Sequence, residues 1–162
     1  MRILHVIPSF APAWYHGGPI YAAFGLTRAL VQQGHKVTVM TTNINGPGVI
    51  DVPLGQPVLM DGVEVWYFPL QWPRAWCFSR PLGCALRQQI PAFDLVHIHS
   101  IFLWPTSAAA FWCRRFNVPY LLRPATVIRF PFLHRVTTPI ELTHLSHIIS
   151  KLKAIPRARA RA

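Results

Sequence analysis

Acidic side chains are scarce in this sequence, which has five Asp and Glu residues against 16 Lys and Arg in 162. A hydrolase that works through a pair of carboxylates is therefore disfavoured, because such an enzyme needs two acids flanking the bond that breaks. The basic residues are spread unevenly: residues 1–123 carry a net charge of +5, whereas residues 124–162 carry +6 in a quarter of the length. The two segments therefore differ in kind.

Cysteines and long apolar runs are also few. Cys77, Cys84 and Cys113 are odd in number and form no CxxC pair, which disfavours a disulfide framework and favours a reducing compartment. The longest apolar run, residues 101–113, is interrupted by a proline and falls short of the ~20 residues that span a bilayer. We expect a cytoplasmic protein, and peripheral contact with the inner membrane face stays open.

What is present is an alternation of strand-like and helix-like segments across residues 1–123. The first helix should begin at Pro19, end before a left-handed Gly34, and bury a stripe of residues at helical spacing (Ile20, Ala23, Phe24, Thr27, Leu30 and Val31). Such alternation predicts an α/β fold with a Rossmann-like, doubly wound parallel sheet. The expected strands cover residues 2–7, 37–41, 63–68, 93–99 and 118–122, and the later helices cover 82–90 and 105–116.

The connecting segments carry turn residues. Residues 43–57, rich in Gly, Pro and Asn, indicate a loop, and Asp61-Gly62 indicates a turn before the strand at 63–68. Beyond Arg123 the pattern changes: Thr138 and Glu141 have the spacing of a capping box, so we predict a helix over 139–153 within a basic tail covering 124–162.

Ligands in open α/β sheets bind outside the carboxyl ends of the strands, so the loops after residues 7, 99 and 122 are the candidate site. Gly17-Gly18 could present bare backbone N–H groups to an anion, or could simply make a turn, because no GxGxxG pattern is present. The substrate-binding candidates are Gly17, Gly18, His99, Ser100 and Arg123.

His97 and His99 lie two residues apart, so on a strand their side chains share one face. A metal pair is conceivable, but Asp94 alone lies near enough in sequence to supply a third ligand. We therefore predict a hydrogen-bonding role at the strand end, with no metal site and no cofactor. Ser100 has no GxSxG context, so no catalytic triad is predicted.

Residues 69–81 interleave aromatic rings with cations (Trp72, Arg74, Trp76, Phe78 and Arg80). This composition suits contact with lipid headgroups or a bulky acceptor, although an ordinary rim packed on the domain edge is the commoner outcome.

Several of these segments, in this order and spacing, resemble the N-terminal domain of group 1 glycosyltransferases, the subfamily-4-like N-terminal domain. The similarity covers about residues 1–124. It rests on MRILHVIP at the start, Gly17-Gly18-Pro19, the pattern LxxALxxxGHxVTV at 26–39, DLVHIHS at 94–100 and Val118-Pro119-Tyr120.

The resemblance implies the N-terminal half of a GT-B fold, in an enzyme that moves a sugar from a nucleotide-sugar to a glycan or lipid-linked acceptor, often a growing surface polysaccharide. In that family this domain mainly binds the acceptor, and its glycine loop, here Gly17-Gly18, approaches the donor diphosphate. The family's donor-binding domain has no counterpart in this sequence, so we expect a truncated chain that is inactive alone and exposes apolar surface that favours self-association.

The sequence departs from the family after Arg123-Pro124. Members usually continue with Pro-His-Gly, whose His lies at the active centre, whereas here Ala125 stands at that position, so no catalytic residue is assigned. One hypothesis is a reading-frame shift near Ala125, which a nucleotide sequence restoring Pro-His-Gly in another frame would establish.

Two alternatives to the glycosyltransferase hypothesis stay open at this point. One is a stand-alone module that binds a sugar or nucleotide and docks through its basic tail. The other is a basic nucleic-acid-binding protein, which is disfavoured because the sequence holds no readout motif.

Overall fold

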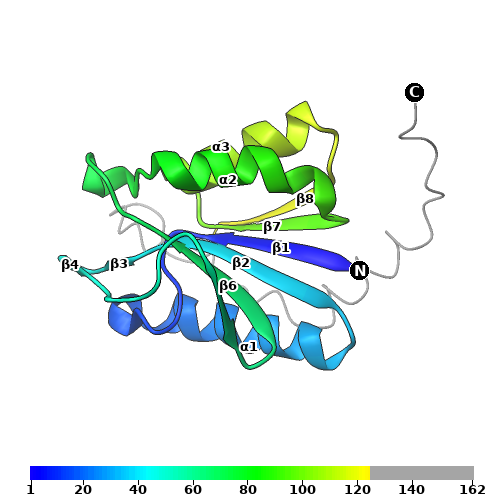
Figure 1. Ribbon diagram of the computed structural model, residues 1–162, viewed down its shortest axis with the longest axis horizontal. Helices are drawn as coiled ribbons and strands as arrows, with labels where there is room; N and C mark the ends of the chain where they lie inside the picture. The colour runs from blue at the N-terminus through cyan, green and yellow to red at the C-terminus, as the bar shows by residue number, and fades with distance from the viewer. Residues whose placement is uncertain (125–162) are drawn as a thin grey trace, which may run out of the picture. The chain divides into compact units, whose positions relative to one another are not determined.

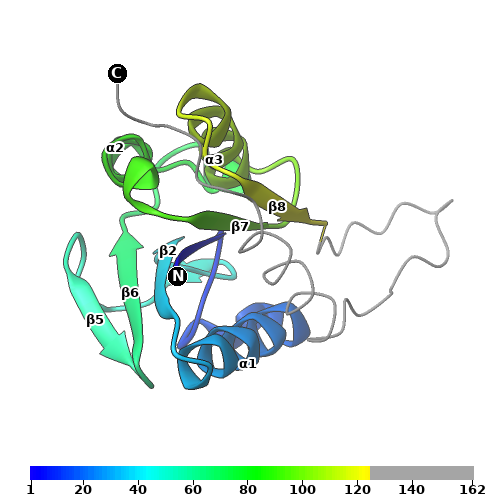
Figure 2. The same cartoon turned by 90° about the vertical axis from the view of Figure 1, so that its right-hand side faces the viewer.

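A computed structural model describes residues 1–124, which form a six-stranded sheet with helices on both faces (Figures 1 and 2). All neighbouring strands run parallel except the first two in sheet order, which are antiparallel. This arrangement confirms the predicted doubly wound α/β fold. In sheet order the strands are β5 (Pro57–Met60), β6 (Val63–Phe68), β2 (Lys36–Thr42), β1 (Arg2–Ile7), β7 (Leu95–His99) and β8 (Tyr120–Arg123).

Strand β1 occupies the middle of the sheet because its residues are apolar on both faces. Ile3, Leu4 and Val6 are fully buried, as expected for a strand covered by helices above and below. From β1 the chain winds outward through β2 to β6, and then returns to the other side of β1 to form β7 and β8. The direction of winding therefore reverses between β1 and β7, where such folds form a ligand crevice.

Helix α1 (Gly18–Gln32) covers one face of the sheet, and α2 (Arg80–Gln89) and α3 (Trp104–Arg115) cover the other (Figures 1 and 2). Helix α1 ends as predicted: Gly34 has φ +81°, and the N–H groups of Gly34 and His35 bond to the carbonyls of Val31 and Leu30. Phe24 is only half-buried and Leu26, absent from the predicted stripe, is buried.

Helices α2 and α3 also match their predictions, with shifted ends. Helix α2 begins at residue 80 rather than 82, because the Ser79 side chain accepts a hydrogen bond from the Leu82 N–H and Pro81 lies in the first turn. Between these helices and the sheet lies an apolar core formed by Leu82, Leu86, Ile90, Ala109 and Cys113 against Leu4, Val6, Met40, Phe68, Val96 and Ile98.

The segment predicted as a loop, residues 43–57, contains a small antiparallel pair, β3 (Ile44–Asn45) and β4 (Gly48–Val49). Strand β5 was not predicted. It begins with Pro57, is only four residues long and alternates between exposed and half-buried side chains, which is typical of an edge strand with a weak hydrophobic signal. The predicted Asp61-Gly62 turn joins it to β6, with φ values of +50° and +81°.

The helix predicted over 139–153 and the rest of the basic tail lie outside the described residues. Among the residues that are described, no helix is both long and apolar enough to cross a membrane.

Two glycine-to-alanine substitutions should change stability in opposite directions. A Cβ at Gly62 would lie 2.8 Å from Val31 Cγ1, and the left-handed backbone disfavours any side chain, so Gly62→Ala should destabilise the protein by about 1–2 kcal/mol. Gly25 lies inside α1 with open space around it, so Gly25→Ala should stabilise by about 0.5–1 kcal/mol. Urea unfolding measures both, and equal effects would contradict the described turn.

Candidate functional site

A cavity of about 240 Å³ opens at the carboxyl ends of β1 and β7, where the winding of the sheet reverses. The end of β1, the end of β7 and the first turn of α1 meet here, as the parallel topology requires. Its walls are made by Ile7, Pro8, Ser9, His16, Pro19, Ile20, Ile44, Cys77, His99, Ser100 and Leu103. The cavity therefore lies where the loops after the first and fourth predicted strands were expected to form a site.

The glycine loop borders this cavity. Gly17 and Gly18 lie between His16 and Pro19, which both line it, and Gly17 has φ +61° as the residue that precedes α1. A Cβ on either glycine would meet nothing within 4 Å, so the backbone here faces open space rather than packed side chains. The two glycines thus both make the turn and leave room for a ligand beside it.

The loop that joins β7 to α3 is held in an unfavourable backbone conformation. Ser100 and Phe102 have φ values of +77° and +61°, in the region that residues with a side chain rarely adopt. The Ser100 N–H donates to the Arg123 carbonyl at 2.8 Å, which fixes the loop to the end of β8. Strained residues of this kind gather at ligand sites, and Ser100 lines the cavity.

Of the five substrate-binding candidates, the structure therefore places His99 and Ser100 in the cavity wall and Gly17 and Gly18 beside it. Arg123 lies at the end of β8 and is not part of the wall, but its carbonyl anchors Ser100. Ala125, which stands at the family's active-site position, lies outside the described residues.

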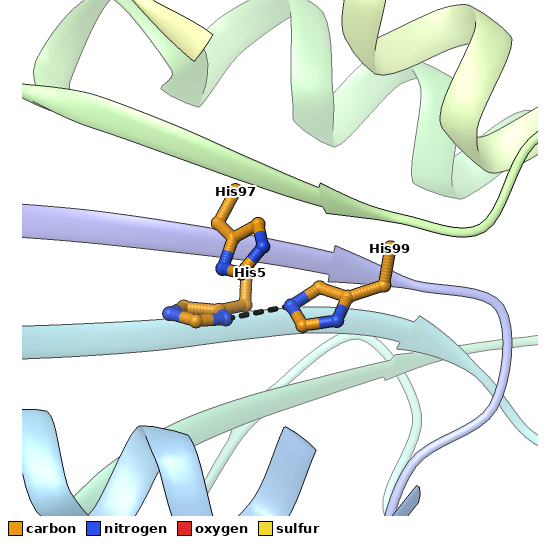
Figure 3. A group of neighbouring side chains, drawn as sticks. All are labelled: His5, His97 and His99. Carbon is orange, nitrogen blue, oxygen red and sulfur yellow. Dashed lines mark hydrogen bonds between the residues drawn. The ribbon is translucent and has the colours of Figure 1, made fainter. Parts of the chain in front are cut away.

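A cluster of three buried histidines extends from the cavity wall into the domain (Figure 3). His5 on β1 lies directly opposite His97 on β7 in the parallel register, and His99 follows on the same face. The even-numbered neighbours on these strands pack toward α2 and α3, so the histidines point to the face that α1 covers. His5 Nδ1 and His99 Nε2 are 3.0 Å apart and form a hydrogen bond.

The histidine cluster was only partly predicted. His97 and His99 share a face as expected, with ring centroids 4.0 Å apart, but the third member is His5 rather than Asp94. Asp94 accepts a hydrogen bond from the Arg2 N–H at the opposite end of the strands. The available signal was that residues 2–7 and 93–99 both have the pattern of a buried strand and carry histidines. Neighbouring strands of a parallel sheet bring such histidines together when their positions match.

All three rings are held neutral. Burial, and secondarily the positive charge of Arg123, lowers the pKa of His97 to about 4. Burial lowers the pKa of His5 and of His99 well below the usual value, and the neighbouring His97 adds to the effect in both. Neutral imidazoles offer one N–H donor and one free nitrogen lone pair each, so the site works through neutral donors and acceptors.

The aromatic and cationic segment at 69–81 divides between structure and surface. Arg74 donates to the carbonyls of Pro47 and Gly48, and the Phe78 ring packs edge-on against Trp104. Trp72 and Trp76 are exposed by 84% and 62%. Cys77, not predicted as a site residue, lines the cavity.

Comparison with known families identifies the chain's family. The model of the family described as Glycosyltransferase Family 4 matches residues 16–154, which is most of the chain. No curated protein matches this chain.

Acidification should destabilise the protein more steeply than protonation of its few carboxylates alone would. Unfolded histidines bind protons below about pH 6.5, whereas buried His97 does not until about pH 4, and burial lowers the pKa of His5 and His99 as well. The unfolded state therefore holds more protons in this window, so the free energy of unfolding decreases as the pH falls. His97 contributes about 1.4 kcal/mol per pH unit in that window. Urea unfolding across this range, with EDTA present, measures the slope.

His97→Gln removes one of these rings and should make the pH slope shallower. His16→Gln, which changes an exposed ring, is the matched control and should leave it unchanged. Equal slopes in all three proteins would contradict the assignment of the pH dependence to the buried cluster.

Proposed function

We propose that the N-terminal domain of this chain binds the sugar acceptor of a nucleotide-sugar-dependent transferase. The premise is that the chain belongs to glycosyltransferase family 4. The observation that carries the proposal is the cavity at the reversal point between β1 and β7. The acceptor class is a glycan or a lipid-linked glycan.

The composition of the cavity wall supports a sugar ligand. Ile7, Ile20, Ile44 and Leu103 supply apolar surface for the C–H faces of a sugar ring, in the mostly apolar manner of small-molecule sites. Polar groups are few and lie at the strand ends and the glycine loop: Ser9, His16, His99 and Ser100. Because His99 is neutral, it can either donate to or accept from a sugar hydroxyl.

The diphosphate of the donor would approach the open backbone at Gly17-Gly18. Neither glycine carries a Cβ that could block it, and the first turn of α1 adds a favourable partial positive charge. This chain supplies no assigned catalytic group, so we expect the 162-residue polypeptide to bind acceptor without turnover. Activity that appears when a donor-binding domain is added would distinguish this function from that of a stand-alone binding module.

Peripheral attachment to the inner membrane face and self-association belong to the same proposal. The exposed rings of Trp72 and Trp76 give the domain a surface that suits the lipid–water boundary, near which a lipid-linked acceptor would lie.

The hypothesis of a changed reading frame near Ala125 stays a prediction for the nucleotide sequence, and the family match runs past that position.

Filling the cavity should abolish acceptor binding. Leu103 lines the cavity, so Leu103→Trp places a large ring in it and should weaken binding of a glycan acceptor at least tenfold by calorimetry. Leu59→Trp adds the same ring at an exposed position on the edge strand β5 and serves as the matched control. Undiminished affinity in a folded Leu103→Trp protein would move the acceptor site elsewhere.

A further inference from the structure

The three buried histidines share a feature that the acceptor-binding role does not use. Each ring can offer one nitrogen such that the three nitrogens lie within 4.8 Å of one another. His5, His97 and His99 are exposed by 0%, 2% and 4%. Among residues 1–124, His5 Nε2 and His97 Nδ1 are buried polar atoms without a hydrogen-bond partner.

We propose that His5, His97 and His99 form a binding site for a single divalent transition-metal ion of the zinc type. The proposal rests on the convergence of three imidazoles from two central strands and on His97 Nδ1, a buried nitrogen without a hydrogen-bond partner. It departs from the sequence-based prediction of no metal site, which rested on the lack of a third ligand beside His97 and His99.

The spacing of the nitrogens suits such an ion. Two ligands at a Zn–N distance of about 2.0–2.1 Å lie roughly 2.8–3.4 Å apart for bond angles between a right angle and a tetrahedral one. His5 Nδ1 and His99 Nε2 are already 3.0 Å apart, and coordination through both would replace the hydrogen bond that joins them. Bringing the third nitrogen in from 4.8 Å or less requires rotation of a ring, while the backbones of β1 and β7 stay paired in the sheet.

The donor set determines the class of metal. Three imidazoles without a carboxylate favour zinc, copper, nickel or cobalt over magnesium, calcium or manganese, which prefer oxygen ligands. The rings are neutral in the folded protein, so their lone pairs are not blocked by protons. The nearby charge of Arg123 opposes a cation, so we expect weaker binding than at a structural zinc site with thiolates.

The site would also communicate with the cavity. His99 is both a member of the cluster and part of the cavity wall, whereas His5 and His97 lie behind it. Three protein ligands leave a fourth coordination position for water or a ligand atom, as in zinc sites that are not purely structural.

A buried water molecule bonded to His5 Nε2 and His97 Nδ1 is the competing explanation. Such a water would bond both atoms, whereas a metal ion held through His5 Nδ1 leaves His5 Nε2 unpaired, but a water predicts no stoichiometric metal binding.

The test is cobalt titration of the full 162-residue chain after removal of metal with EDTA. We expect one Co²⁺ per chain with intense visible bands of a tetrahedral site, displacement by Zn²⁺, and no displacement by Mg²⁺. His97→Gln should weaken Co²⁺ binding at least tenfold. Two controls should bind as the unmodified chain does: His35→Gln, which changes a histidine outside both the cluster and the cavity wall, and a variant in which His134, His144 and His147 are replaced by Gln.

Failure to bind, binding with octahedral bands only, or loss of binding in the tail variant rather than in His97→Gln would each overturn the proposal in favour of a bridging water. Should His97→Gln not fold, NMR of the histidine rings in the unmodified chain decides the matter. Zn²⁺ should shift the ring resonances of His5, His97 and His99, and shifts confined to other histidines would overturn the site.

Discussion

The parallel pairing of β1 with β7 is the constraint on which the rest of the domain depends. Both strands are buried on both faces, and each backbone N–H and C=O must find its partner in the neighbouring strand because no water can replace it. That pairing fixes the register, and the register brings His5 opposite His97. It also sets the position of the loops that follow the two strands, which together with α1 enclose the cavity.

The cavity follows from topology more than from any one motif. Because the chain winds outward from β1 in one direction and then returns to build β7 on the other side, the loops after β1 and β7 diverge and leave space between them. Ser100 and Phe102, in the loop after β7, adopt positive φ angles. The hydrogen bond from the Ser100 N–H to the Arg123 carbonyl holds this loop in place. Backbone strain at this point is offset by the packed sheet beneath it.

The scarcity of acids in the sequence is matched by the chemistry of the site. The whole chain has five carboxylates, and none of the four within residues 1–124 lines the cavity. Its polar groups are hydroxyls and imidazoles, and burial keeps the imidazole of His99 uncharged. Such a wall can hydrogen-bond a neutral sugar in either direction, and the same neutrality leaves imidazole lone pairs available for a metal ion.

Local sequence determined the elements because each depends on interactions within one segment. Pro19 and Gly34 delimit α1, Asp61-Gly62 makes the turn before β6, and the apolar runs at 2–7 and 93–99 identify central strands. Only tertiary structure could join His5 to His97, since 92 residues separate them and pairing of strands is a non-local choice. The edge strand β5 and the course of the loop at 69–81 were likewise decided by packing, because weakly patterned segments take the conformation that the neighbouring sheet allows.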